Sequence, residues 1–333
     1  MNMRRFFIFL GIIGLGVLFA TNLNALEHFI DDLAQVHWYL IPLIIIIQLA
    51  SYYSNARFYD AFFALSGHHV PIWRLIKVSL AINFTNQVIP AGGVAGTTYL
   101  SRSLADVVPP GKSTLSQLGR YIFTVISNVP LLAFGMIVIF FSGSIRHISV
   151  RLVLLIVMLI LTAGIAAISY FSERSRMRRV ASPLIRGYNR VGRFFFRHHF
   201  KPLTAVEVGE FFDEFYSGYR EIMRKKRSWV GLFTWAAAGT LAEMATIYAT
   251  FIGFGYWPNI GVVILAYQIA IVASLIGPFT AGAGALEFGM VGGFTALGVP
   301  FALSFAVVIV YRFLNMILFL PPGFYFYRKD LAT

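Results

Sequence analysis

The residues that could do chemistry in this chain are the few charged and polar side chains set within apolar sequence. Between residues 229 and 311 the only charges are Glu243 and Glu287, and Arg312 follows directly. An ionisable group at membrane depth is costly, so each is a candidate functional residue. We expect Glu287 and Arg312 to pair or to face one polar cavity. Asn315 lies one helical turn beyond Arg312, on the same face.

Each of these groups also has a purely structural interpretation. A Glu287–Arg312 pair could simply fix a helical hairpin to the last membrane span. Glu243 is either a relay or coordinating group, or a protonated carboxyl group that hydrogen-bonds to a neighbouring helix. The sequence leaves both alternatives open.

A second polar set lies in the first half of the chain. Asn83, Asn86 and Gln87 share one helix face, at i, i+3 and i+4. Arg120 and Asn128 lie two turns apart on one face of a later span, with Arg120 near its cytoplasmic end. In the functional interpretation, these side chains contact a substrate within the membrane. The alternatives are helix–helix hydrogen bonds of about 1 kcal/mol each and, for Arg120, a side chain that reaches the membrane surface.

Two turns rich in glycine must position these side chains. Each follows a proline, Pro90 or Pro278, and a helix does not continue through such a stretch. Broken backbone in a membrane is tolerated only where protein buries it or where it lines an aqueous cavity. Its N–H groups could bind an anion, for which a lipid phosphate is the natural candidate. The glycines assigned to this site are Gly92, Gly93, Gly96, Gly282 and Gly284.

The composition is that of an integral membrane protein. The 333 residues are 58% hydrophobic and 12% charged, and soluble domains carry about 25% charged residues. Apolar runs predict an all-α, polytopic protein with about six full transmembrane helices. These are expected at residues 5–21, 38–56, 115–141, 150–171, 229–252 and 300–326.

The positions of Lys and Arg predict how the spans are oriented. Arg4 holds the N-terminus and Arg328 the C-terminus in the cytoplasm, so the number of crossings is even. The broken segments 72–101 and 260–298 must then each enter and leave on one side. We predict two re-entrant hairpins in an inverted-topology repeat, with the site near the midplane between them. The alternative is that either hairpin is a kinked full helix.

The chain is expected to form a single membrane domain, residues 1–333. Half one spans about 38–171 and half two 229–327, with a basic cytoplasmic loop at 172–228. This loop holds 14 of the 27 Lys and Arg residues, and its second half is typical of an amphipathic helix on the membrane. The net charge of +13 is thus expected to face anionic lipid, and nucleic acid is not an expected partner.

Several apparent motifs lack the spacing that their chemistry needs. The His pairs at 68–69 and 198–199 are adjacent and do not give the i, i+4 geometry of a zinc helix. Residues 111–113 resemble the end of a P-loop, but Asp106 stands where its first glycine is required. The chain has no Cys. We expect no metal, no cofactor and no enzymatic activity.

A series of short motifs extends along residues 40–327. In chain order they are Ala56-Arg57, Trp73-Arg74, Asn83-Phe84-x-Asn86, Pro90-x-Gly92-Gly93-x-x-Gly96, Arg120, Pro278, Gly282-x-Gly284-x-x-Glu287, Leu297-Gly298-Val299-Pro300 and Arg312-Phe313-Leu314-Asn315. This order resembles the lysylphosphatidylglycerol synthase transmembrane family, also called flippase-like. The second-half motifs are the most specific. The chain departs from the family at Thr97, Leu100, Gly119 and Leu286, where members often carry charges.

The resemblance implies a bacterial or archaeal inner-membrane protein that translocates a phospholipid or a lipid-linked anionic headgroup. Larger members add a C-terminal soluble synthase domain. The sequence given ends at Thr333, so we expect no synthase activity. The alternatives are a non-catalytic membrane subunit of a lipid- or glycan-modifying enzyme and a small-solute secondary transporter. Membrane phospholipids are the expected partners, and an enzyme partner and a second copy of the chain are further candidates.

Overall fold

The computed structural model describes residues 37–88, 94–142, 228–276 and 284–332, with isolated positions between 158 and 225. Within these ranges every regular element is a helix, which confirms the all-α prediction. Several predicted features lie outside the described residues. They are the spans at 5–21 and 150–171, most of the basic loop, and Gly92, Gly93 and Gly282.

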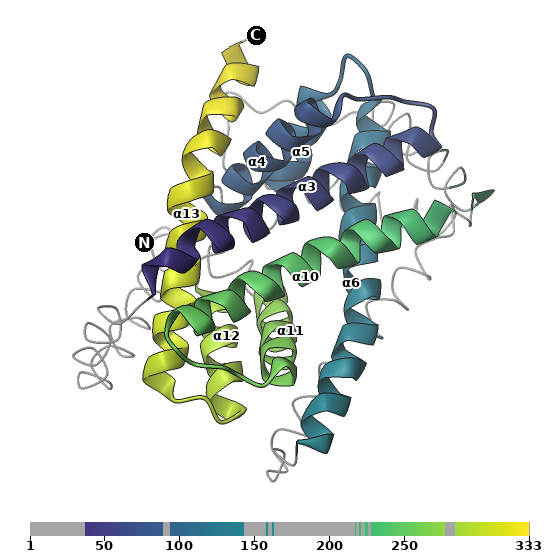
Figure 1. Cartoon of the computed structure of the whole chain (residues 1–333). Helices are drawn as coiled ribbons and strands as arrows, with labels where there is room; N and C mark the ends of the chain where they lie inside the picture. The colour runs from purple at the N-terminus through teal and green to yellow at the C-terminus, as the bar shows by residue number, and fades with distance from the viewer. Residues whose placement is uncertain are drawn as a thin grey trace, which may run out of the picture.

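The first half is a long helix, two short helices and a second long helix (Figure 1). A 3-10 turn, η1 (Trp38–Leu40), leads into α3 (Ile41–Leu65), and then come α4 (Ile72–Val88), α5 (Val94–Ser103) and α6 (Pro110–Phe141). Helices α4 and α5 pack against each other and form the first helix pair. At about 1.5 Å per residue, the 17 residues of α4 and the 10 of α5 are each too short for a hydrocarbon core of about 30 Å.

The second half repeats this order. It consists of α10 (Trp229–Gly253), α11 (Ile260–Ile276), α12 (Ala285–Ala296) and α13 (Phe301–Ala332). Helices α11 and α12 pack side by side as the second helix pair (Figure 1). With 17 and 12 residues, they too are shorter than a full span. Both broken segments therefore fold as paired short helices in the described part of the chain.

Three described helices are long and apolar enough to cross a membrane. They are Pro110–Phe141, Trp229–Gly253 and Phe301–Asp330, and they correspond to the spans predicted at 115–141, 229–252 and 300–326. Large apolar side chains on these and neighbouring helices are exposed, among them Ile46, Phe134, Phe140 and Phe313. Such a surface fits lipid contact, and the protein is a multi-pass membrane protein.

Helix α3 runs past Arg57, where the sequence predicts the end of a span. Arg57 stays within the helix because Asp60, one turn on, pairs with it at 2.6 Å and the ring of Trp235 lies 5.3 Å from its guanidinium carbon. The residues that follow continue the buried face of the helix to Leu65. They are Phe58, Tyr59, Phe62 and Phe63.

Two hydrophobic clusters make up most of the core, one around each helix pair. The first cluster surrounds α4 and α5 and includes Leu75 and Leu100, together with the ends of α3, α6 and α10. The second surrounds α11 and α12 and includes Val263 and Met290. The long helices α6 and α10 contribute side chains to both clusters. They therefore set the spacing between the two helix pairs.

Polar side chains lie between the two clusters. Along α6, Asn128 stands between Phe123 of the first cluster and Leu132 of the second. Its Oδ1 accepts a hydrogen bond from Gln268 Nε2 on α11, at 2.9 Å. Along α10, Glu243 likewise lies between residues of the two clusters. Polar side chains on α6 and α10 therefore lie between the two clusters along each helix.

The second helix pair packs through small residues. A Cβ atom added at Gly289 would lie 2.8 Å from the Cα of Ala270, and one added at Gly293 would lie 2.9 Å from the Cα of Ala266. The four residues form two small-xxx-small patterns that allow close backbone approach. This contact fixes α12, and with it Glu287, against α11.

Candidate functional site

Glu287 and Arg312 form the ion pair that the sequence predicts. Glu287 is the third residue of α12, and its Oε2 accepts a hydrogen bond of 3.0 Å from the backbone N–H of Gly284. Its Oε1 pairs with Nε of Arg312 on α13. The two side chains are only 21% and 22% exposed. Each charge is therefore cancelled by the other in a largely water-excluded place.

The pair has a direct structural effect. It ties the start of α12 to α13, and Glu287 also satisfies one of the N–H groups left open at a helix start. A carboxylate in the first turn is further favoured by the helix dipole. Because its charge is balanced by Glu287, Arg312 can bind a second anion only after the two side chains separate.

Glu243 is the centre of a hydrogen-bond cluster that joins three helices. Its carboxylate accepts from Gln48 Nε2 at 3.1 Å, Ser51 Oγ at 2.8 Å and Tyr311 OH at 2.7 Å. Gln48 and Ser51 lie on α3, and Tyr311 lies on α13. These three hydrogen bonds tie α10 to α3 and α13.

Arg120 on α6 has only neutral contacts among the described residues. Its Nη1 donates to Asn55 Oδ1 at 3.1 Å, and its guanidinium carbon lies 5.2 Å from the ring centre of Tyr121. Its Nε is buried and has no hydrogen-bond partner in the described part of the chain. A guanidinium held in this way is prepared to bind an anion.

The surroundings of Arg120 are fixed by packing and by further hydrogen bonds. Tyr59 OH donates to Gln117 Oε1, and Gln117 Nε2 donates to Tyr121 OH at 2.8 Å. A Cβ atom at Gly119 would lie 2.7 Å from the ring of Phe62. A larger side chain at position 119 would therefore require the ring of Phe62 to move.

The polar residues of α4 are used within the protein. Gln87 Nε2 donates to Asn83 Oδ1 at 2.9 Å, and Asn83 Nδ2 donates to Tyr52 OH. Asn86 Oδ1 accepts from the backbone N–H of Gly96 in the first turn of α5, at 3.0 Å. For Asn83 and Asn86 the structure supports the alternative of hydrogen bonding between helices.

Two of the N–H groups predicted to bind an anion are described, those of Gly96 and Gly284, whereas Gly92, Gly93 and Gly282 lie outside the described residues. The N–H of Gly96 donates to Asn86, and the N–H of Gly284 donates to Glu287. Both groups already have an acceptor within the chain. Of the described groups, the guanidinium of Arg120 is therefore the better candidate to bind an anion.

Sequence reasoning missed the partners of Glu243 and Arg120. Gln48, Ser51 and Asn55 are spaced three and four residues apart and lie on one face of α3. A polar stripe at helical spacing within an apolar span was the available signal. It is uncharged, so it stands out less than a lone acid or base.

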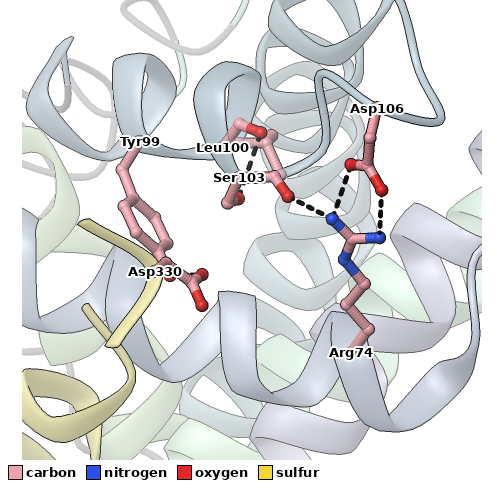
Figure 2. Close-up of polar contacts among 6 residues, drawn as sticks. All are labelled: Arg74, Tyr99, Leu100, Ser103, Asp106 and Asp330. Carbon is pink, nitrogen blue, oxygen red and sulfur yellow. Dashed lines mark hydrogen bonds and ion pairs between the residues drawn. The ribbon is translucent and has the colours of Figure 1, made fainter. Parts of the chain in front are cut away.

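A bidentate ion pair lies where α4 of the first helix pair begins, as Figure 2 shows. Arg74 donates to the two carboxylate oxygens of Asp106 at 2.8 and 2.6 Å, and to the carbonyl oxygen of Ser103 at 2.6 Å. These hydrogen bonds from Arg74 hold the pKa of the Asp106 carboxyl group below its usual value. The contact fixes the start of α4 to the connection between α5 and α6.

Helix α13 also contacts this first pair. Asp330 accepts a hydrogen bond from Tyr99 OH on α5 (Figure 2). A Cβ atom at Gly323 would lie 2.6 Å from the carbonyl oxygen of Leu80 on α4, so the two backbones are in close contact. Through Asp330 at one end and Arg312 at its middle, α13 joins both helix pairs.

Among the described residues, no group of three His, Cys, Asp or Glu side chains is placed to hold a metal ion.

A search of curated proteins and a search of solved structures each gave no significant match. The family described as the lysylphosphatidylglycerol synthase TM region matches residues 6–323, a range that includes both helix pairs, Arg120, Glu243 and the Glu287–Arg312 pair. The chain is therefore a multi-pass membrane protein that belongs to the lysylphosphatidylglycerol synthase transmembrane-region family, whose members are involved in the handling of membrane lipids.

Proposed function

We propose that the protein translocates a phospholipid, or another lipid with an anionic headgroup, between the leaflets of the cytoplasmic membrane. The observation that carries this proposal is the neutral setting of Arg120. Its side chain is partly buried and, in the described part of the chain, contacts only neutral groups. A lone guanidinium in a membrane protein is costly. A phosphate group supplied by the substrate would offset that cost.

Arginine suits a phosphate because its planar fork matches two phosphate oxygens. Nη1 of Arg120 is held by Asn55, and Nε has no described partner. An anion that reached this face of the guanidinium would gain a charge-assisted bond without breaking an ion pair. Arg312 differs, because a phosphate there must first displace Glu287.

The two arginines occupy corresponding places in the two halves. Arg120 lies ten residues after the start of α6 at Pro110, and Arg312 lies eleven after the start of α13 at Phe301. In the proposed topology both termini are cytoplasmic, and the helix pairs are re-entrant hairpins that open to opposite sides. The headgroup binds at Arg120 and then exchanges with Glu287 at Arg312.

The test is translocation of a fluorescent phosphatidylglycerol in proteoliposomes, followed by quenching of the outer leaflet. Replacing Arg120 with Gln is expected to slow translocation by about ten- to a hundredfold, the range for losing a charge-assisted hydrogen bond. Arg328→Gln removes the same charge at an exposed position of α13 and should leave the rate unchanged. Wild-type rates in Arg120→Gln, or in both Glu287→Gln and Arg312→Ala, would contradict the proposal.

The two alternative functions predict other outcomes of this experiment. A membrane subunit of a lipid- or glycan-modifying enzyme would show no translocation alone and would co-purify with a transferase. A small-solute transporter would leave the labelled lipid in place and accumulate an anionic solute in the vesicles. In that case Arg120→Gln would abolish solute uptake.

A further inference from the structure

Glu243 and Arg120 are held by neighbouring residues of α3. Ser51 Oγ donates to the Glu243 carboxylate at 2.8 Å, and Asn55 Oδ1 accepts from Arg120 Nη1 at 3.1 Å. Ser51 and Asn55 follow i, i+4 spacing, so they lie on one helix face with Cβ atoms about 6 Å apart. The phenol of Tyr267 on α11 also interacts electrostatically with both charges. A carboxylate and a guanidinium therefore lie about one helical turn apart, each bound by neutral groups in the described part of the chain.

The two charges are close enough to be coupled. At a separation of about 10 Å and an effective dielectric constant of about 20, two unit charges change an equilibrium constant by on the order of tenfold. An anion that binds Arg120 compensates the positive charge there, so Glu243 loses this attraction. The neutral form of Glu243 is then favoured by about the same factor. A neutral Glu243 in turn favours the anion, because coupling between two sites is reciprocal.

The partners of Glu243 suit the carboxyl group both with and without a proton. Ser51 and Tyr311 bond it through hydroxyl groups, which can donate or accept. A protonated Glu243 donates a hydrogen bond to Ser51 Oγ, and the hydroxyl hydrogen of Ser51 turns to a backbone carbonyl oxygen of its own helix. Ser54 already bonds the carbonyl oxygen of Ala50 in this way, at 2.7 Å. The carboxyl group therefore keeps its partners in either charge state.

The other ionisable groups that face Glu243 from the packed helices are mostly phenols, which are neutral near pH 7. They are Tyr52 on α3, Tyr267 on α11 and Tyr311 on α13. Arg312 on α13 is balanced by its ion pair with Glu287. Arg120 on α6 has no carboxylate partner among the described residues. The charge that an arriving anion would change at Glu243 is therefore that of Arg120.

We propose that Glu243 is a proton-binding site coupled to the anion site at Arg120. Binding of an anionic headgroup at Arg120 promotes uptake of a proton from water by Glu243, which forms the O–H bond of a neutral carboxyl group. Arg120 and Glu243 together have no net charge before binding, and the anion and the proton together add none. This limits the cost of charge within the membrane. The inference rests on the proposed function and adds that a proton gradient contributes energy to translocation.

The first experiment measures proton uptake when a short-chain phosphatidylglycerol binds the detergent-solubilised full chain. Isothermal titration calorimetry in two buffers of different ionisation enthalpy gives the number of protons, and the phosphodiester of this lipid keeps its charge near neutral pH. A tenfold coupling predicts uptake that reaches about half a proton per lipid as the pH is varied. Glu243→Gln should bind the lipid without proton uptake. Asp60→Asn alters a carboxylate that is paired with Arg57 and should take up protons as the wild type does.

The second experiment needs no lipid, because Arg120→Gln removes the charge that a bound anion would compensate. Infrared spectroscopy detects protonated carboxyl groups by their carbonyl stretch, and the band that disappears in Glu243→Gln belongs to Glu243. At a pH where the wild type shows a partial band, we expect the band to be about two- to threefold larger in Arg120→Gln, as a tenfold coupling predicts. Arg328→Gln, at an exposed position, should leave the band unchanged.

Other results would overturn the inference. Lipid binding without proton uptake at any pH, with equal infrared bands in Arg120→Gln and the wild type, would make Glu243 a structural acceptor and leave the proposed function intact. Proton uptake that persists in Glu243→Gln would place the proton on another group. Absence of lipid binding to the wild type would contradict the proposed function and the coupling with it. The two proposals therefore fail in different ways.

Discussion

The second short helix of each helix pair begins with different chemistry. In the first, the neutral Asn86 accepts the N–H of Gly96 at the start of α5. In the second, the charged Glu287 accepts the N–H of Gly284 at the start of α12. The charged solution requires a cation, and Arg312 supplies it. The neutral solution leaves Arg120, the corresponding arginine, without a carboxylate among the described residues.

This difference assigns different roles to two similar residues. Arg312 is part of an ion pair whose loss would leave a charge uncompensated, so it contributes to stability. Arg120 lies in a neutral setting of Asn55 and Tyr121, so its charge is available to a ligand. In the proposed transport, Arg120 is the open position for the headgroup and Arg312 the closed one.

The largest expected effect is on the second pair. Glu287→Ala leaves Arg312 buried and unpaired, and we expect a loss of about 3 kcal/mol in the free energy of unfolding, as for other broken buried pairs. Thermal or chemical unfolding in detergent measures it. Arg120→Gln, by contrast, should change stability by under about 1 kcal/mol, because it breaks no ion pair.

A double variant sharpens that result. Glu287→Gln combined with Arg312→Gln removes both charges, and it should be more stable than Glu287→Ala alone, since no charge is left uncompensated. The matched single variants are Glu287→Gln and Arg312→Gln. If the stability lost in the double variant equals the sum of their two losses, the side chains are not coupled. The ion pair would then not explain how α12 is held to α13.

The next effect concerns how α12 is positioned. In Gly293→Ala the new methyl group meets the backbone of Ala266, and we expect a loss of about 1–3 kcal/mol from overpacking. Gly292→Ala is the matched control, because a Cβ atom there meets nothing within 4 Å. It should stabilise the helix by about 1 kcal/mol. Equal melting temperatures for the two variants would rule out close α11–α12 contact.

The first pair should respond more weakly to loss of its cap. Asn86→Ala removes the acceptor for Gly96 N–H, and a lost helix cap costs about 1 kcal/mol. Faster hydrogen exchange in the first turn of α5 would report it. Asn86→Asp keeps an acceptor and should exchange like the wild type. Unchanged exchange in Asn86→Ala would mean that the first pair is held by other contacts.

The smallest expected effect is the pH dependence of the stability that the Arg74–Asp106 ion pair contributes. The pKa of Asp106 is lowered in the folded state by Arg74, below the usual 3.8. The stabilisation is therefore present above 3.8 and lost as the pH falls through the folded-state pKa. Compared with Asp106→Asn, the wild type should have a small, constant advantage in Tm between about pH 5 and pH 8 that disappears in acid. An advantage that grows in acid would contradict this sign.

Much of this arrangement could be predicted from the sequence. Charges within apolar sequence stand out, so Glu287 and Arg312 were expected to meet. Pro90 and Pro278 with their glycines predicted two interruptions, and the structure has a pair of short helices at each. These features are local or carry a strong energetic penalty, and both properties are visible in a single sequence.

Other features depend on tertiary packing. Gln48 and Glu243 lie 195 residues apart in the chain, and nothing local to either residue indicates the other. The extension of α3 past Arg57 depends on Asp60 and Trp235 together. The N–H groups of Gly96 and Gly284 were expected to face an anion because their acceptors, Asn86 and Glu287, had been assigned to a substrate.

The most direct test of the account is binding of phosphatidylglycerol to the purified protein, measured by native mass spectrometry at several lipid concentrations. The account predicts that Arg120→Gln raises the Kd by about tenfold or more, the effect of losing a charge-assisted hydrogen bond. Arg328→Gln should bind as the wild type does. Equal affinity in all three proteins, or an equal loss in both variants, would contradict the claim that Arg120 is the open position for an anionic headgroup.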